Sequence, residues 1–326
     1  LVKTMRASFY VLGPFMGRYK YAEVSLPGGC AWGPRPVDFH LKALEAMGAK
    51  ISLEKGNLIS KGELSGADIN FEKVSVGATG NTLMAAVKAN GYTNIKNAAC
   101  EPEITDLVDF LNNLGSDIKG KGTKSLKISG KSKLKNSLEF SIIPDRIEAG
   151  TFLIAVALTG GEVTLKNVNY KHLETLISKL RDTGVRIEYD SSSITIYSNG
   201  KITPVDLKTA VYPGFPTDLQ AQWIALMCMA NGNSTVTDEI YHDRFTHVAE
   251  LKRFGAKINL NDNVASIKGV KKLIGAPVMS TDIRASASLI IAALAAENKS
   301  EISRIYHNDR GYEKIEYKLK SLGAQI

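Results

Sequence analysis

The sequence has few cysteines, no long apolar run and no block of like charges. Three of its 326 residues are cysteine and none forms a Cys-x-x-Cys pair, so we expect neither a disulfide framework nor a zinc site of that kind. Scattered free cysteines favour a reducing cytoplasm. The longest apolar stretches, 223–230 and 285–296, fall short of the roughly 18–20 residues that span a bilayer, so we predict no membrane segment.

Positive charge is in excess but is not concentrated. There are 41 Lys and Arg against 33 Asp and Glu, which gives a formal charge of +8. The lysines are spread along the chain in helical patterns, which argues against a nucleic-acid partner. The arginines lie in Gly- and Pro-rich loops instead. We therefore interpret the charge as suited to a small, phosphate-rich ligand.

A short phrase that ends helices recurs five times along the chain. Its glycines are spaced 67, 69, 71 and 68 residues apart, at Gly48, Gly115, Gly184, Gly255 and Gly323. Each follows a helical pattern and precedes an alternating strand pattern, which predicts a left-handed helix C-cap. Each repeat also holds a second helix that is apolar nearly all round, and such helices are buried. These inner helices are expected at 82–89, 151–158, 223–230 and 287–297.

The repeats predict an α/β fold of two domains. The polar, lysine-rich segment 131–141 is followed by Ile142-Ile-Pro-Asp145, which has turn character, so we place the boundary near 141. Domain 1–141 then holds two repeats and domain 142–326 holds three. The first repeat is incomplete at its start and the last stops at Ile326, so we expect an N-terminal segment to be missing.

Cys30 is the first candidate for chemistry. It lies in a loop, 26–38, with three glycines and three prolines, and Arg35 nearby favours a reactive thiolate. Inert packing is an equally good interpretation from local sequence. Cys228 lies within a buried helical pattern and is interpreted as packing, and Cys100 as structural. The five histidines have no metal-ligand spacing, so we predict no metal and no cofactor.

Arginines and one aspartate form the second set of candidates. Arg6, Arg284 and Arg310 each precede small residues, a context that suits an anion clamp, although a surface ion pair is the plainer alternative. Asp218 follows Gly214-Phe-Pro-Thr217. It can be a helix N-cap or, with a substrate hydroxyl in reach, a general base. The pattern by itself favours the cap.

Taken together, eight motifs resemble the enolpyruvyl transferase family. They follow the family's order along the whole chain: Met5-Arg-Ala-Ser8, Pro27-Gly-Gly-Cys30, Gly33-Pro-Arg-Pro-Val-Asp38, Val74-Ser-Val-Gly-Ala-Thr79, Phe215-Pro-Thr-Asp-Leu-Gln-Ala-Gln222, Asp243-Arg-Phe245, Thr281-Asp-Ile-Arg-Ala-Ser286 and Asp309-Arg-Gly-Tyr312. The resemblance implies two inverse α/β barrels built from repeated helix-and-sheet units. It also implies transfer of the enolpyruvyl group of phosphoenolpyruvate to the 3′-hydroxyl of UDP-N-acetylglucosamine, the first committed step of peptidoglycan synthesis.

The resemblance also assigns roles to residues. Cys30 would be the loop acid, able to form an adduct with phosphoenolpyruvate and to react with fosfomycin. Asp218 would take the hydroxyl proton, and Arg35, with Arg6 and Arg310, would hold phosphoenolpyruvate. Asp282, Ile283 and Arg284 would line the cleft between the domains. The implied substrate-binding residues are Arg6, Arg35, Pro36, Val37, Asp38, Phe39, Lys73, Val74, Ser75, Val76, Gly77, Asp218, Ile240, Arg244, Asp282, Ile283 and Arg284.

One departure and three alternatives stay open. The family's catalytic Lys-Asn pair, near the N-terminus of full-length members, is absent from the start of this chain, so we expect the chain alone not to turn over substrate. The Pro-Gly-Gly-Cys loop argues against the shikimate-pathway transferase of the same fold. A non-catalytic nucleotide-sugar-binding paralogue is the second alternative. RNA-processing proteins with related repeats are the third, disfavoured because basic and stacking aromatic residues are not clustered.

Overall fold

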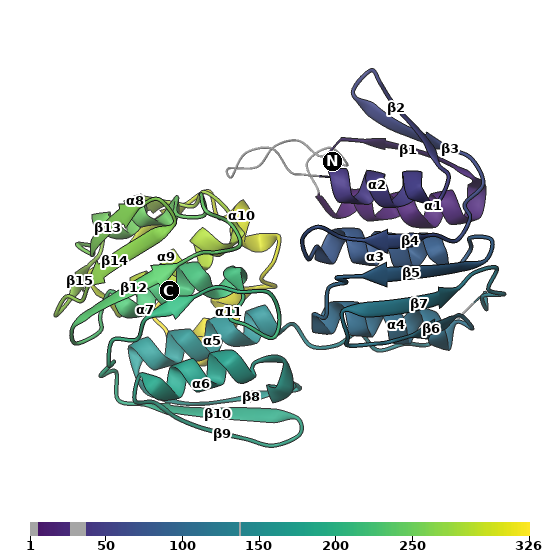
Figure 1. Ribbon diagram of the computed structural model, residues 1–326. Coiled ribbons are helices and arrows are strands. Elements are labelled where there is room, and N and C mark those ends of the chain that lie inside the picture. The colour runs from purple at the N-terminus through teal and green to yellow at the C-terminus, as the bar shows by residue number, and fades with distance from the viewer. Residues whose placement is uncertain (1–5, 27–36, 137) are drawn as a thin grey trace. The chain divides into compact units, whose positions relative to one another are not determined.

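The computed structural model describes residues 6–26, 37–136 and 138–326, and only the backbone at residues 6 and 7. The chain divides into two compact units, unit 1 (Leu1–Ile143) and unit 2 (Pro144–Ile326) (Figure 1). The sequence placed this division near 141. Each unit has its own hydrophobic core, so each is described by itself.

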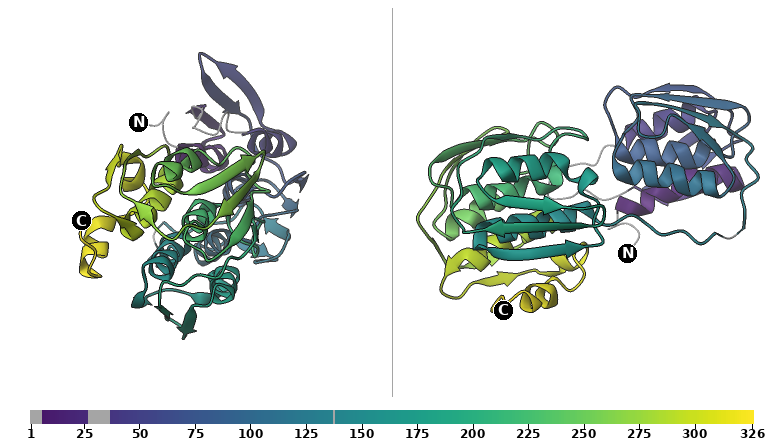
Figure 2. Two further views of the ribbon diagram at one scale, coloured as in Figure 1. Left: turned by 90° about the vertical axis from the view of Figure 1, so that its left-hand side faces the viewer. Right: turned by 90° about the horizontal axis from the view of Figure 1, so that it is seen from below.

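In its described residues, unit 1 packs four α-helices against two sheets. The first sheet, in the order β1-β3-β2, is antiparallel, and the second, β4-β5-β7-β6, begins with a parallel pair. Helix α3 is buried along most of its length and packs against α1, α2 and α4 (Figure 2). The elements are η2 (Arg6–Val11), α1 (Leu12–Tyr19), β1 (Tyr21–Ser25), α2 (Asp38–Ala46), β2 (Lys50–Glu54), β3 (Asn57–Lys61), β4 (Asp68–Asn70), α3 (Val76–Ala86), β5 (Tyr92–Lys96), α4 (Pro102–Asn113), β6 (Asp117–Lys119) and β7 (Ser125–Ser129).

The first part of unit 2 repeats this arrangement. Its elements are α5 (Arg146–Thr159), β8 (Gly161–Lys166), η3 (Tyr170–His172), α6 (Glu174–Asp182), β9 (Arg186–Tyr189), β10 (Ser193–Ser198), β11 (Leu207–Lys208), η4 (Thr217–Leu219), α7 (Gln220–Met227), β12 (Asn233–Thr237), α8 (His247–Arg253), β13 (Lys257–Asn261) and β14 (Val264–Lys268). The sheet β11-β12-β14-β13 has the same strand order and directions as β4-β5-β7-β6. Two separate stretches of chain therefore fold by the same plan.

The last part of unit 2 contributes shorter strands. It contains β15 (Leu273–Ile274), β16 (Pro277–Met279), α9 (Ile283–Ala295), β17 (Ala296–Glu297), β18 (Glu301–Ser303), α10 (Tyr306–Asp309) and α11 (Ile315–Ser321). Strands β15 and β17 form one parallel pair, and β16 and β18 form another. Helices α5, α7 and α9 pack against one another in the core, and the buried Trp223 belongs to this packing.

The repeat predictions are confirmed in their main features. All five repeat glycines have φ between +88° and +109°, two residues after α2, α4, α6, α8 and α11 end. A residue without Cβ adopts this conformation without strain. The inner helices α3, α5, α7 and α9 are mostly buried, as expected. They begin a few residues earlier than the apolar runs indicated, because Ser75, Asp145 and Asp282 cap three of them with their side chains. Among the residues described, no helix is long and apolar enough to cross a membrane.

Candidate active site

The predicted site residues fall into two groups, one in each unit. Unit 1 carries Val37, Asp38 and Phe39 at the start of α2, and residues 73–77 at the start of α3. Unit 2 carries Asp218, Ile240, Arg244, Asp282, Ile283, Arg284 and Arg310. Cys30, Arg35 and Pro36 lie outside the described residues, as does the side chain of Arg6.

The two stretches of unit 1 lie next to each other. The ring of Phe39, in the first turn of α2, is 6.3 Å from that of Phe71, two residues before Lys73. The Ser75 hydroxyl accepts a hydrogen bond from the amide of Ala78 at 3.2 Å and caps α3. Lys73 itself is exposed. Two helix N-termini with a nearby lysine form a suitable environment for phosphate groups, because free amide donors and the helix dipoles favour negative charge.

A charged cluster forms around Asp218 in unit 2. Its Oδ1 atom accepts hydrogen bonds from Arg244 Nη2 at 2.7 Å and from Arg284 Nε at 3.2 Å. Arg244 also donates to the Thr217 hydroxyl at 3.0 Å, and Arg284 donates to the Tyr312 hydroxyl at 3.1 Å. We call these five residues the Asp218 cluster. They come from η4, the loop before α8, the start of α9 and the turn after α10, and α9 contacts α7, α8 and α10.

Burial differs sharply within the cluster. The side chains of Arg244 and Arg284 are 10% and 15% exposed, whereas that of Asp218 is 41% exposed. Burial alone would raise the pKa of Asp218, but the positive charges of Arg244 and then Arg284 outweigh it and hold this pKa well below its usual range. Asp218 in turn helps to raise the pKa of Arg284 above its ordinary value, against the effect of burial. The carboxylate is therefore ionised at neutral pH and accessible to a ligand.

The structure excludes one of the two interpretations of Asp218, the helix cap. Helix α7 begins at Gln220 with Leu219 as its N-cap and has no side-chain cap, and η4 has none either. The expectation that Asp218 caps a helix is therefore wrong. The two arginines, which are 26 and 66 residues away in sequence, hold its carboxylate instead.

The remaining predicted residues of unit 2 have local structural roles as well. Asp282 is 9% exposed and caps α9 by accepting from the amides of Arg284 and Ala285 at 2.8 and 3.2 Å. Ile283 packs against Gly311, where an added Cβ would clash with its side chain. Arg310 is exposed after α10, and Ile240 is half-buried. Arg284, predicted as an anion clamp, has Asp218 as the anion that it binds in this structure.

Several residues in and around the Asp218 cluster were not predicted as site residues. The Tyr312 hydroxyl lies 3.0 Å from the Thr151 hydroxyl, and the Gln222 amide donates to both hydroxyls. Tyr312 is 1% exposed, so its hydroxyl is fixed beside Arg284. Tyr312, Thr217 and Gln222 all lie within the motifs that carried the family resemblance, which was the signal that could have identified them.

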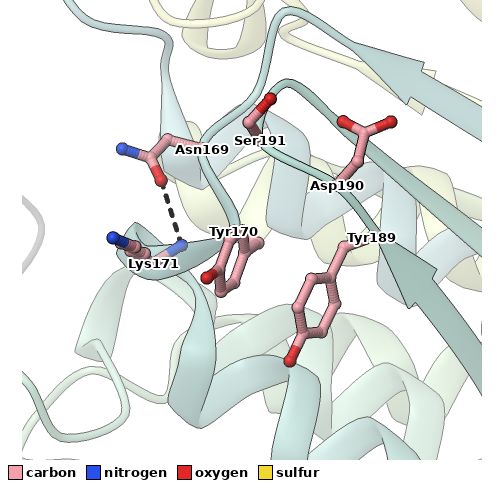
Figure 3. A pocket seen from close by; sticks show the side chains of 6 residues that line it. All are labelled: Asn169, Tyr170, Lys171, Tyr189, Asp190 and Ser191. Carbon is pink, nitrogen blue, oxygen red and sulfur yellow. Dashed lines mark hydrogen bonds between the residues drawn. The ribbon is translucent and has the colours of Figure 1, made fainter.

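A separate surface pocket of about 430 Å³ lies in unit 2. Its lining residues are Asn169, Tyr170, Lys171, Tyr189, Asp190 and Ser191 (Figure 3). The rings of Tyr170 and Tyr189 are stacked, with centroids 4.2 Å apart. The pocket shares no residue with the Asp218 cluster, and we assign no substrate to it.

Comparison with known proteins identifies the family. A model of the EPSP synthase (3-phosphoshikimate 1-carboxyvinyltransferase) family matches residues 1–319. The chain belongs to this family. Two relatives are named UDP-N-acetylglucosamine 1-carboxyvinyltransferase. The one from Chlorobium chlorochromatii (strain CaD3) is 53% identical to this chain, and the one from Geotalea daltonii (strain DSM 22248 / JCM 15807 / FRC-32) is 54% identical to it. Both matches cover 100% of this chain and 78% of the relative.

Solved structures confirm the enolpyruvyl transferase fold predicted for this member of the EPSP synthase family. The enolpyruvyl transferase NikO from Streptomyces tendae has a TM-score of 0.88 at 24% identity, over 99% of this chain and 78% of that one. The EPSP synthase from Acinetobacter baumannii has a TM-score of 0.72 at 20% identity, over 98% and 77%. These structural matches establish the fold alone, because their sequence identities are low, and the relatives above carry the argument about substrate.

Proposed function

We propose that this chain carries the site of an enzyme that transfers the enolpyruvyl group of phosphoenolpyruvate to the 3′-hydroxyl of UDP-N-acetylglucosamine, the first committed step of peptidoglycan synthesis. The observation that carries the proposal is the accessible, ionised Asp218 held between two arginines. The relatives at 53% and 54% identity bear the name of this activity. The Pro-Gly-Gly-Cys loop argues against a shikimate substrate.

The reaction proceeds by addition and elimination. The sugar oxygen bonds to C2 of phosphoenolpyruvate while C3 gains a proton, which gives a tetrahedral intermediate. A proton then leaves C3, the C2–O bond to phosphate breaks, and the double bond forms again. Asp218 accepts the hydrogen of the sugar hydroxyl. Because its two arginines lower its basicity, we expect proton transfer to be favoured when an anionic substrate draws one guanidinium away from it.

The other predicted residues complete the proposed site. Cys30 donates the proton to C3 and is the residue that fosfomycin alkylates. Arg6, Arg35 and Arg310 hold the anionic groups of phosphoenolpyruvate. The N-termini of α2 and α3, with Lys73, hold the diphosphate of the nucleotide, and Ile240 contacts the nucleotide. A cytoplasmic location belongs to the same proposal, supported by the few scattered cysteines.

Fosfomycin labelling tests the proposal without requiring turnover. We expect a stoichiometric adduct at Cys30, seen by peptide mass spectrometry and dependent on added UDP-N-acetylglucosamine. Cys30→Ala should abolish the adduct, and Cys100→Ala is the matched control that should retain it. Phosphate release on addition of both substrates is measured in parallel. A chain that binds UDP-N-acetylglucosamine but forms no adduct and releases no phosphate would support the alternative of a non-catalytic nucleotide-sugar-binding paralogue.

A further inference from the structure

Asp238 is a fully buried carboxylate that the proposed reaction does not use. It is 0% exposed and lies directly after β12. Its Oδ1 atom accepts from the Thr209 hydroxyl at 2.7 Å and from the amides of Ile240 and Tyr241 at 2.9 Å each. Its Oδ2 atom accepts from the Thr217 hydroxyl at 2.6 Å. Four donors compensate the cost of burying this charge.

The two oxygens face different parts of unit 2. Oδ1 fixes the turn at 240–241, which carries the proposed nucleotide contact Ile240. Oδ2 holds Thr217, whose oxygen accepts from Arg244 Nη1 at 3.0 Å. Arg244 then donates through Nη2 to Asp218 at 2.7 Å. A single buried carboxylate is thus linked both to the turn and to Asp218.

The direction of the hydrogen bonds in this chain is fixed by chemistry. A guanidinium has no acceptor and a carboxylate has no donor. The single hydroxyl hydrogen of Thr217 must therefore point to Asp238, which leaves the oxygen lone pairs for Arg244. The guanidinium of Arg244 therefore donates from Nη1 to Thr217 and from Nη2 to Asp218. Because the guanidinium is planar, the bond to Thr217 fixes the direction in which Nη2 donates to Asp218.

A simpler account covers only half of these contacts. Asp238 accepting from the amides of Ile240 and Tyr241 is an ordinary turn in which an aspartate bonds the backbone two and three residues on. Such a turn needs one carboxylate oxygen, and an asparagine provides it equally well. It does not account for the second oxygen, which contacts Thr217.

We propose that Asp238 is a positioning residue that couples the nucleotide-contacting turn at Ile240 to Asp218 through Thr217 and Arg244. The inference rests on the proposed function, because it assigns the sugar hydroxyl to Asp218 and the nucleotide to Ile240. It predicts that the two arms can be separated by mutation.

The experiment compares the binding of UDP-N-acetylglucosamine and of UDP by calorimetry, with circular dichroism to show that each variant is folded. Thr217→Val removes the link to Arg244 and keeps the turn. We expect it to weaken UDP-N-acetylglucosamine roughly tenfold, the effect of one misplaced hydrogen bond to a charged group, and to leave UDP unchanged. Thr217→Ser keeps the hydroxyl and should restore wild-type binding of both ligands.

Two variants of Asp238 separate its oxygens. In Asp238→Asn the amide oxygen can still hold the turn, but the amide nitrogen faces Thr217 and reverses that hydrogen bond. Its profile should follow Thr217→Val. Asp238→Ala loses both arms and should weaken both ligands.

Each result bears on a different part of the proposal. If Thr217→Val and Thr217→Ser bind UDP-N-acetylglucosamine equally well, or if Asp238→Asn weakens UDP as much as Asp238→Ala does, the coupling is refuted while the proposed function stands. If the wild-type chain binds neither ligand, the proposed function fails and the inference fails with it.

Discussion

Replacing Asp218 by asparagine tests the electrostatics of the cluster directly. Asp218→Asn removes the carboxylate and leaves the guanidiniums of Arg244 and Arg284, 10% and 15% exposed, without their counter-charge. Removing one partner of a buried ion pair costs about 3–5 kcal/mol, whereas exposed pairs contribute about 0–1 kcal/mol. Because Asp218 is itself 41% exposed, we expect an intermediate loss of about 2 kcal/mol.

Urea unfolding followed by tryptophan fluorescence measures this loss in unit 2 alone. Trp223 is 0% exposed and packs at 5.5 Å against Phe215, and Trp32→Phe makes it the sole tryptophan. With a slope of about 2 kcal/mol per molar urea, the midpoint should fall by about 1 M. The matched control is Glu297→Gln, which breaks an exposed pair with Lys272 at 2.9 Å and should change stability by less than about 0.5 kcal/mol.

The pH dependence gives a second and independent check. A carboxyl with a lowered folded pKa contributes stability that is fully present above its unfolded pKa and is lost as pH falls toward the folded pKa. The difference between wild type and Asp218→Asn should therefore be the same at pH 7 and pH 5, and should shrink only below about pH 4. A difference that grows as the pH falls from 7 to 5 would mean that the folded pKa of Asp218 is raised, so that burial dominates over the arginines, and would refute the reasoning.

Three further predictions concern residues outside the cluster's acid–base chemistry. Burial, and then the charge of Arg244, lower the pKa of His247 to about 3. Because the unfolded chain binds a proton at His247 that the folded chain does not, the free energy of unfolding should fall by up to about 1.4 kcal/mol per pH unit below pH 6. His247→Phe should flatten this slope, as measured by urea unfolding at each pH. Burial raises the pKa of Cys228 to about 12, so iodoacetamide at pH 8 should leave it unmodified in the folded chain and label it in urea, as read by mass spectrometry. Gly13→Ala places a Cβ 2.2 Å from the backbone carbonyl oxygen of Asn81, so we expect the free energy of unfolding, measured by thermal unfolding, to fall by about 1–3 kcal/mol. The control is Gly91→Ala, whose added Cβ would have no neighbour within 4 Å. It should show only the smaller cost of a left-handed backbone.

The sequence predicted most of the secondary structure because its signals are local. An apolar residue at every third or fourth position, followed by Gly184 or Gly255, specifies a helix and its end within a dozen residues. The apolar stretch around Trp223 shows that its helix is buried, since no polar face is left for water. Helix starts were less well predicted, because a capping residue such as Asp282 lies several residues before the apolar run that marks the helix.

The role of Asp218 was not predictable from its neighbours in sequence. The segment around Asp218 is compatible with a helix cap, and the alternative depended on family resemblance. The decisive partners, Arg244 and Arg284, lie 26 and 66 residues further along the chain. No local pattern indicates which charges will meet across that distance.

The sequence by itself therefore determined the repeats, the left-handed glycines that end their helices, the buried inner helices and the family. The first three follow from periodicity and backbone sterics, which act between near neighbours, and the family follows from the resemblance of its motifs. The tertiary structure alone decided that Asp218 is shared by two nearly buried arginines, that Tyr312 fixes one of them, and that Asp238 holds the other through Thr217. These contacts depend on how α7, α8 and α9 pack, because burial brings charges from distant segments together and requires each to be compensated.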